Sequence, residues 1–264
     1  VYTYKICYFM DAQSVRADCL SSMTKDSKAY FLLGFCVLRL RKVLSTMATG
    51  NAVKEKYYAD ITGTSQDTYD DKAMYEAVKR LFDVVVSVLL LVILIVPMII
   101  LDVIIKLDSP GAGIYTQERL GRYGIPFTLY KFRSMHLNAE VSGPQWAQVN
   151  DCRCTKFGRF IRKRHLDELP QLINVIKGEM SLVGPRPERE FFYNEFSEYI
   201  NGFSKRLAVT PGITGWAQVN GGYRLTPEEK LHYDLEYINK RSFSFDIKCI
   251  IRTVKVIFTH DGAF

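Results

Sequence analysis

The sequence predicts an α+β protein that is mostly helical, with one membrane-inserted helix kinked at Pro97, a small β-hairpin and interfacial amphipathic helices. Three observations support this fold class. Residues 84–101 carry no charge, residues 113–135 combine strand-forming residues with a glycine-containing turn, and two later segments repeat apolar residues at helical spacing.

The composition points to an anionic partner. The chain has 264 residues, a net charge of +7 and a pI near 9.0, which favours a phosphorylated substrate, an anionic lipid or a nucleic acid. Nucleic acid is the weakest of the three, because the charge is mild and no long Lys/Arg run occurs. The six cysteines form no C-x-x-C pair, which argues for reduced thiols rather than a zinc site or disulfide framework.

Residues 1–78 carry no clear motif and form an N-terminal segment of undefined role. Residues 28–44 read as a helix too short to span a bilayer, and either packing or an interfacial position fits it. Residues 49–71 are polar and rich in turn-forming residues, which is typical of a linker. The chain starts at Val1 without a visible signal peptide, as expected of a fragment. We expect residues 79–264 to form the main domain.

Residues 84–101 are a membrane-helix candidate, since about 18 apolar residues can cross a bilayer core. A buried core helix is the weaker alternative, because a chain of this size rarely hides such a helix on all sides. Pro97 removes a backbone hydrogen bond and predicts a kink. Cations flank both ends, and Asp102 is costly in hydrocarbon, so the helix either returns to its own face or spans. From residue 108 onward, 22 Lys and Arg outnumber 17 Asp and Glu, which predicts a cytosolic location.

Residues 113–135 predict a β-hairpin around a turn at residues 121–124. In its second strand, Lys131 and Arg133 follow Phe127 and Leu129 at alternate positions, so all four share one face. Two cations in line at the end of a strand could hold an anion. They could equally be solvated surface charges.

Residues 244–260 repeat apolar residues at helical spacing, with Lys248, Arg252 and Lys255 on the other face. A basic amphipathic helix of this kind can lie on an anionic membrane. Packing on the protein core with a solvated basic face is the alternative.

A second apolar helical stripe runs through residues 166–176 and starts beside the carboxylate pair Asp167 and Glu168. Asp167 suits an N-cap and Pro170 suits a first helical turn. Arg162 precedes the pair, and Arg186 follows between two prolines that restrict its backbone. Arginines and a helix N-terminus together favour phosphate binding.

Two roles are open for Asp167. It could be a nucleophile that accepts a phosphoryl group. Alternatively, Asp167 and Glu168 could only hold a magnesium ion that shields phosphate charge.

Further on, residues 210–221 form a Pro/Gly-rich loop that could bind a ligand or be a structural turn burying Trp216. Asp234 and Glu236 read as solvated charges on a helix surface.

Four motifs follow one another in an order that resembles the bacterial sugar transferases. These are KRLFDVVVSVLLLVILIVPMII, YTQERLGRYGIPFTLYKFRSM, LDELPQLINVIKGEMSLVGPRPE and RLAVTPGITGWAQVNG. The chain is similar to their monotopic polyprenyl-phosphate glycosyl-1-phosphate transferases, over residues 79–259. This resemblance implies that residues 79–264 are a membrane-anchored catalytic domain whose re-entrant helix bends at Pro97. Val96 stands where the family has a serine.

The resemblance also implies a mechanism. Asp167 of the Asp167–Glu168 pair attacks the β-phosphate of a UDP-sugar, releases UMP and forms a covalent phosphosugar intermediate, with Mg²⁺ required. Polyprenyl (undecaprenyl) phosphate then takes the phosphosugar. The positions that match the family's basic and acidic site residues are Arg133, Arg162, Arg186, Asp234 and Asp246, and the alternation adds Lys131. Gly222 stands where an arginine often follows QVNG.

The implied function is the first membrane step of exopolysaccharide, capsule or other surface-glycan synthesis, on the cytoplasmic face of the inner membrane. Its partners are the UDP-sugar, polyprenyl phosphate and membrane lipids, not nucleic acid; a homo-oligomer and polysaccharide-assembly proteins stay open. One alternative is a catalytically inactive, membrane-tethered protein that binds an anion or nucleotide. Another is a structural subunit of a polysaccharide-export complex.

Overall fold

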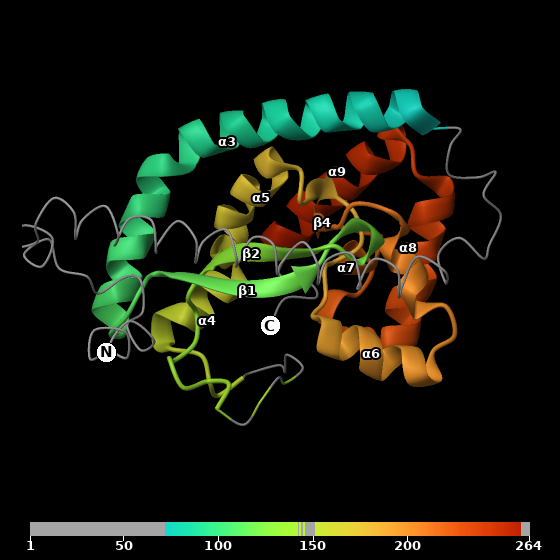
Figure 1. Ribbon diagram of the computed structural model, residues 1–264. Coiled ribbons are helices and arrows are strands. Elements are labelled where there is room, and N and C mark those ends of the chain that lie inside the picture. Colours follow the sequence, from blue (N-terminus) through green and yellow to red (C-terminus); the bar gives the residue numbers. More distant parts are fainter. Residues whose placement is uncertain (1–71, 142, 144, 146–150, 260–264) are drawn as a thin grey trace, which may run out of the picture. The chain divides into compact units, whose positions relative to one another are not determined.

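The computed structural model describes residues 72–259 except 142, 144 and 146–150, and all of them belong to the unit that comprises Gly50–Phe264. This part is mostly helical with short strands, which confirms the α+β class (Figure 1). The helix expected at residues 28–44 and the linker at 49–71 lie outside the described residues. The larger elements are α3 (Ala73–Asp108), β1 (Ile114–Leu120), β2 (Pro126–Phe132), α4 (Lys156–Lys163), α5 (Leu172–Lys177), β3 (Ser181–Val183), α6 (Glu190–Tyr199), β4 (Gly212–Thr214), α7 (Trp216–Val219), α8 (Pro227–Lys240) and α9 (Phe243–Thr259).

The long apolar helix α3 continues through Pro97 rather than ending there, and it changes direction along its length (Figure 1). Among the described residues it is the helix long and apolar enough to cross a membrane, and only 6% of its most apolar window is buried. Side chains such as Leu89 and Val92 are exposed on it. Such an apolar surface is unstable in water, so α3 indicates association with a membrane.

Both ends of α3 attach to the same folded unit. At its start, Lys79 pairs with Asp246 of α9 at 2.9 Å, and Arg80 donates to the last carbonyls of α5. At its end, Arg133 donates to the carbonyls of Ser109 and Pro110 just beyond the helix. These carbonyls have no partner within a helix, so a buried guanidinium there stabilises the helix end.

The predicted β-hairpin is confirmed. Strands β1 and β2 pair antiparallel from Ile114–Phe132 to Leu120–Pro126, around the short 3₁₀ turn η4 (Arg122–Gly124). Phe127 and Leu129 point inward and are buried, as the period-two pattern predicts.

A second strand pair, β3 with β4, is parallel and was not predicted. Each strand has three residues, and Ser181 faces Gly212 while Val183 faces Thr214. Strands this short carry no readable alternation. A side chain at residue 212 would collide with the backbone of Gly184 at 2.1 Å, so glycine allows the two segments to approach.

The main hydrophobic core lies between the hairpin, α5, the β3–β4 pair, α8 and α9. Phe127, Val175, Trp216, Tyr237 and Cys249 are buried in it, and Phe82 and Val86 of α3 pack against it.

The predicted C-terminal helix is confirmed as α9. Lys248 and Arg252 lie over the Trp216 ring at 4.8 and 4.6 Å, whereas Ile251 and Val254 are exposed.

Asp234 of α8 is not the solvated charge that the sequence suggests. It is buried and pairs with the equally buried Arg206 of η6 (Phe203–Ala208) at 2.6 Å. The prediction was wrong because the acid and its partner are 28 residues apart in the sequence, and only the tertiary fold brings them together.

We expect Asp234→Asn to lower the free energy of unfolding by about 3–5 kcal/mol, because it leaves the Arg206 charge buried without its carboxylate. Thermal unfolding of the detergent-solubilised protein measures this. Lys240→Ala is the matched control, since it removes an exposed ion pair with Glu236 on the same helix. Equal, small effects of both substitutions would show that the buried pair does not stabilise the fold.

Candidate active site

The carboxylates Asp167 and Glu168 lie in the first turn of a 3₁₀ helix, η5 (Leu166–Gln171). The α-helical part, α5, begins only at Leu172, so the expectation that Asp167 caps an α-helix was wrong. His165 starts η5 in the left-handed conformation, with φ of 56°, which is uncommon for a residue other than glycine. The sharp turn at His165 buries both carboxylates, each to 7% exposure.

Asn174 of α5 fixes the helix against the hairpin. Its amide donates to the carbonyl of Thr128 and to Glu179, and its oxygen accepts from the backbone N–H of Tyr130. The side chain is fully buried. It therefore sets the position of η5 beneath strand β2, where Lys131 lies.

Glu168 forms a bidentate ion pair with Arg186, with N···O distances of 2.6 and 3.3 Å. The backbone around Arg186 is held as well: its carbonyl accepts from Arg206, and that of Pro185 accepts from Gly212. Burial acts to raise the pKa of Glu168, but the Arg186 guanidinium outweighs it and holds this pKa below its usual value. Glu168 is therefore ionised, and the positive charge of Arg186 largely neutralises its negative charge.

The electrostatic environment of Asp167 differs. Its side chain makes no hydrogen bond to any residue in the described part of the chain. Burial first, and then the neighbouring Glu168, raise the pKa of Asp167 to about 7, while Lys131, Arg162 and Arg186 act in the opposite direction. Asp167 is thus an unsolvated carboxylate within a field of three cations.

A cavity of about 540 Å³, here called the basic cavity, is lined by Lys131, Arg162 and Arg186, the three cations that act on Asp167. Its lining includes eight Lys and Arg against the two acids Glu140 and Glu188: Arg119, Lys131, Arg133, Arg153, Arg162, Arg186, Arg189 and Lys230. Burial lowers the pKa of Lys131 to about 8, and Arg119 adds to this effect. This excess of cations suits a ligand with several negative charges, such as a diphosphate.

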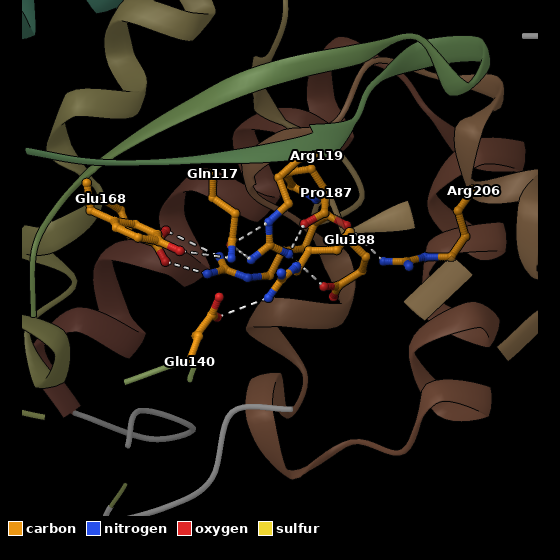
Figure 2. A network of polar contacts seen from close by, with 10 residues as sticks. Gln117, Arg119, Glu140, Glu168, Pro187, Glu188 and Arg206 are labelled. Atoms are coloured by element: carbon orange, nitrogen blue, oxygen red, sulfur yellow. Dashed lines mark hydrogen bonds and ion pairs between the residues drawn. The ribbon is translucent and has the colours of Figure 1, made fainter. Parts of the chain in front are cut away.

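Arg119 and Glu188 belong to the site although sequence reasoning missed them. Arg119 donates to Gln117, to the carbonyl of Pro187 and to Glu188, and Figure 2 shows these residues together with Glu168 beneath the hairpin. Residues 117 and 119 alternate on β1 opposite the strand that carries Lys131. The same period-two argument, applied to the first strand, could have found Arg119.

The structure separates the other residues that the sequence singled out. Lys131, Arg162 and Arg186 surround Asp167, whereas the Arg133 guanidinium is bonded to the end of α3, although it also lines the basic cavity. Asp234 is linked to Arg186 through Arg206, which donates hydrogen bonds to the Asp234 carboxylate and to the Arg186 carbonyl. Asp246 lies elsewhere and binds Lys79, Tyr75 and Tyr237, so it anchors α3.

A second cavity, of about 330 Å³ and here called the apolar cavity, is lined by Glu168 and Arg186. Phe82, Val86 and Leu90 of α3 line it, together with Ile250, Val254 and Ile257 of α9. Gly222 also lines this cavity. Glu168 therefore lines the apolar cavity, and its partner Arg186 lines both the apolar and the basic cavity.

The two carboxylates could hold one divalent cation. No group of three or more His, Cys, Asp or Glu side chains suited to a metal occurs in the described ranges. Magnesium does not need one, because it binds through one or two carboxylates and completes its octahedron with water and substrate phosphates. The donors at Asp167 and Glu168 therefore fit Mg²⁺ delivered with a phosphorylated ligand.

The chain belongs to the bacterial sugar transferase family, whose model matches residues 74–260. It is 41% identical over 193 residues to a UDP-N-acetylgalactosamine-undecaprenyl-phosphate N-acetylgalactosaminephosphotransferase of Aeromonas hydrophila, covering 72% of this chain and 46% of that protein. It is 41% identical over 191 residues to the UDP-glucose:undecaprenyl-phosphate glucose-1-phosphate transferase of Escherichia coli, covering 70% of this chain and 41% of that one. The matched region thus spans less than half of either relative.

The match covers a larger share of a shorter relative. A putative undecaprenyl-phosphate N-acetylgalactosaminyl 1-phosphate transferase of Bacillus subtilis is 50% identical over 135 residues, which cover 51% of this chain and 75% of that protein.

Asp167→Asn is expected to raise thermal stability increasingly as the pH rises. The folded pKa of about 7 lies above the unfolded value of about 3.9. Ionised Asp167 therefore destabilises the fold, and the stability it contributes when protonated is lost between these two pH values. Melting temperatures of wild type and variant, compared from pH 5 to pH 8, should diverge up to about pH 7 and then stay parallel.

Glu198→Gln, at an exposed position of α6, is the control for removing one carboxylate. Its difference from wild type is the baseline with which the pH dependence of Asp167→Asn is compared. A constant difference for Asp167→Asn would contradict the electrostatic description of the site.

Proposed function

We propose that this protein transfers a sugar-1-phosphate from a UDP-sugar to a polyprenyl phosphate. The observation that carries the proposal is the buried carboxylate of Asp167, which lies among Lys131, Arg162 and Arg186 while Glu168 is neutralised by Arg186. The names of the relatives support the same chemistry, since each combines an undecaprenyl phosphate with transfer of a sugar phosphate.

In the first step, a carboxylate oxygen of Asp167 attacks the β-phosphorus of the UDP-sugar. A new O–P bond forms, and the bond from this phosphorus to the bridging oxygen breaks, so UMP leaves with that oxygen. The basic cavity holds the diphosphate, and its fixed cations stabilise the charge that shifts onto the leaving phosphate. Arg186 is preorganised for this task by its ion pair and its prolines.

In the second step, a phosphate oxygen of the polyprenyl phosphate attacks the same phosphorus. The bond to Asp167 breaks, the carboxylate is restored, and the product is a polyprenyl diphosphosugar. The apolar cavity beside α3 and α9 supports this step, because it can receive the apolar tail of the acceptor while the acceptor phosphate attacks from the position that UMP has vacated. One carboxylate can thus serve two substrates in succession.

Mg²⁺, bound at Asp167 and Glu168 with the substrate phosphates, would withdraw charge from the diphosphate and favour attack by an anion. The residues of the chain then have separate tasks: Arg186 keeps Glu168 ionised, and the cations of the basic cavity orient the phosphates.

The membrane part of the proposal is a re-entrant α3 that bends near Pro97 and returns to the cytoplasmic face of the inner membrane. The attachment of both helix ends to the same folded unit supports it, because a spanning helix has its ends on opposite faces. The exposed apolar residues Ile251 and Val254 support an interfacial α9. The resulting lipid-linked sugar would begin synthesis of an exopolysaccharide, capsule or other surface glycan.

Asp167→Asn is expected to lower the rate of UMP release by several orders of magnitude, because an amide is not a nucleophile, while binding of the UDP-sugar is retained. The assay uses solubilised protein, Mg²⁺, undecaprenyl phosphate and a panel of UDP-glucose, UDP-galactose and UDP-N-acetylgalactosamine. The control is Glu198→Gln on exposed α6, with the wild-type rate expected. Near-normal turnover by Asp167→Asn would refute the assignment, and binding without turnover by the wild type would favour an inactive binding protein.

A separate experiment tests whether both ends of α3 lie on the same face of the membrane. Met74 and Leu107 lie near the two ends of α3, and both are 82% exposed. In a variant without native cysteines, Met74→Cys and Leu107→Cys should both react with a membrane-impermeant maleimide only after the inner membrane is opened. Labelling of the two positions from opposite sides would show that α3 spans the membrane.

A further inference from the structure

The membrane helix α3 carries a buried carboxylate, Asp83, that the proposed reaction does not use. Asp83 is 3% exposed and lies immediately before the uncharged run of this helix. Its Oδ1 accepts a hydrogen bond from the backbone N–H of Leu182 in β3 at 3.2 Å. Burying a carboxylate is costly unless it is bonded, so this contact explains how the fold tolerates Asp83.

Asp83 completes the hydrogen bonding of β3. On one edge this strand pairs with β4, and the N–H of Gly184, just after the strand, donates to the carbonyl of Thr214 at 2.8 Å. The N–H of Leu182 has its acceptor on α3, in the carboxylate of Asp83. A buried backbone N–H without an acceptor costs about as much free energy as a lost hydrogen bond. Both β4 and α3 therefore hold β3 in place.

The strand that Asp83 holds leads directly to the arginine of the site. Arg186 follows Leu182 by four residues, and the two prolines beside Arg186 restrict the backbone there. Its guanidinium forms the bidentate pair with Glu168. Because so restricted a segment absorbs little displacement, a shift of β3 relative to α3 would move the guanidinium relative to Glu168.

The preceding turn of α3 holds the segment of the other partner. Arg80 donates to two carbonyls in the last turn of α5, at 2.5 and 2.8 Å. α5 continues directly from η5, which carries Glu168. Residues three apart in a helix lie on the same face, so Arg80 and Asp83 contact the domain together. One turn of α3 is thus attached to both segments whose side chains form the Glu168–Arg186 pair.

We propose that Asp83 is a positioning residue that holds Arg186 against Glu168, so that the membrane helix fixes the geometry of the donor site. The inference rests on the proposed function, in which Arg186 binds the diphosphate of the UDP-sugar. Among the described residues, Asp83 is not one of those that line the basic cavity. It therefore acts on a bound diphosphate only through Arg186.

The test measures the affinity for UDP with Mg²⁺ by calorimetry on the detergent-solubilised wild type, Asp83→Leu, Arg186→Ala and the double variant. Leucine is similar in size to aspartate but accepts no hydrogen bond. We expect Asp83→Leu to weaken UDP binding about tenfold when Arg186 is present, on the order of one charge-assisted hydrogen bond. In the Arg186→Ala background the same change should weaken it less than about twofold, because residues that act through one another are not additive.

Asp83→Asn should restore most of the affinity, since its amide oxygen can accept from the N–H of Leu182. Ser87→Ala is the matched control and should leave UDP binding unchanged. Ser87 lies one turn later on α3 and is fully buried, and its hydroxyl has no hydrogen-bond partner within the described residues. Melting temperatures identify a variant that does not fold, and Asp83→Ala then replaces Asp83→Leu, because it removes the same acceptor without added bulk.

Two results would overturn the inference. An equal loss of affinity in both backgrounds would give Asp83 a general structural role, and an unchanged affinity in Asp83→Leu would show that Arg186 does not depend on it. A wild type that binds no UDP would overturn it as well, because Arg186 would then hold no diphosphate.

The proposed function fails separately. If the wild type binds UDP but releases no UMP from any UDP-sugar, the transfer reaction is wrong, while the UDP affinities still decide whether Asp83 positions Arg186.

Discussion

The ion pair between Arg186 and Glu168 is the interaction on which the site depends. Two adjacent buried carboxylates repel each other, and each would tend to take up a proton. Arg186 neutralises Glu168, so the cationic field of Lys131 and Arg162 acts mainly on Asp167. The β3–β4 pair, two prolines and buried Arg206 all hold the Arg186 backbone in place. Gly212 of the small second sheet and Asp234 of α8 therefore both help to position one guanidinium.

The location of this pair explains how water-soluble and lipid-soluble partners could meet. The basic cavity lies on the side of the hairpin, and the apolar cavity lies on the side of α3 and α9. Because α3 is attached to the domain at both ends, its apolar surface stays next to the second cavity. In the proposed mechanism, Asp167 reacts first with a nucleotide-linked phosphate and afterwards with a lipid phosphate. Because Phe82, Val86 and Leu90 of α3 line the apolar cavity, this helix would then shape the acceptor site as well as attach the protein to the membrane.

Local patterns in the sequence predicted the local parts of the structure. The uncharged run, the alternation around the glycine turn and the 3.6-residue repeat of α9 each identified an element correctly, since each pattern depends only on neighbouring residues. The β3–β4 pair was missed because three-residue strands show no period, and Asp234 was misread because Arg206 is distant in sequence. The cations Lys131, Arg162 and Arg186 were found from their motifs, and the alternation of the first strand could also have found Arg119. Lys230 carries no such signal and is identified only from the lining of the two cavities.

The central claim is that Asp167 carries the sugar phosphate between the two substrates. The most direct measurement is peptide mass spectrometry of wild-type protein mixed with Mg²⁺ and its UDP-sugar, quenched before acceptor is added. We expect the mass of one sugar phosphate on the peptide that contains Asp167, and its loss when undecaprenyl phosphate is supplied. A sugar phosphate on Glu168 or another residue, or product formed without any protein adduct at any time, would contradict it.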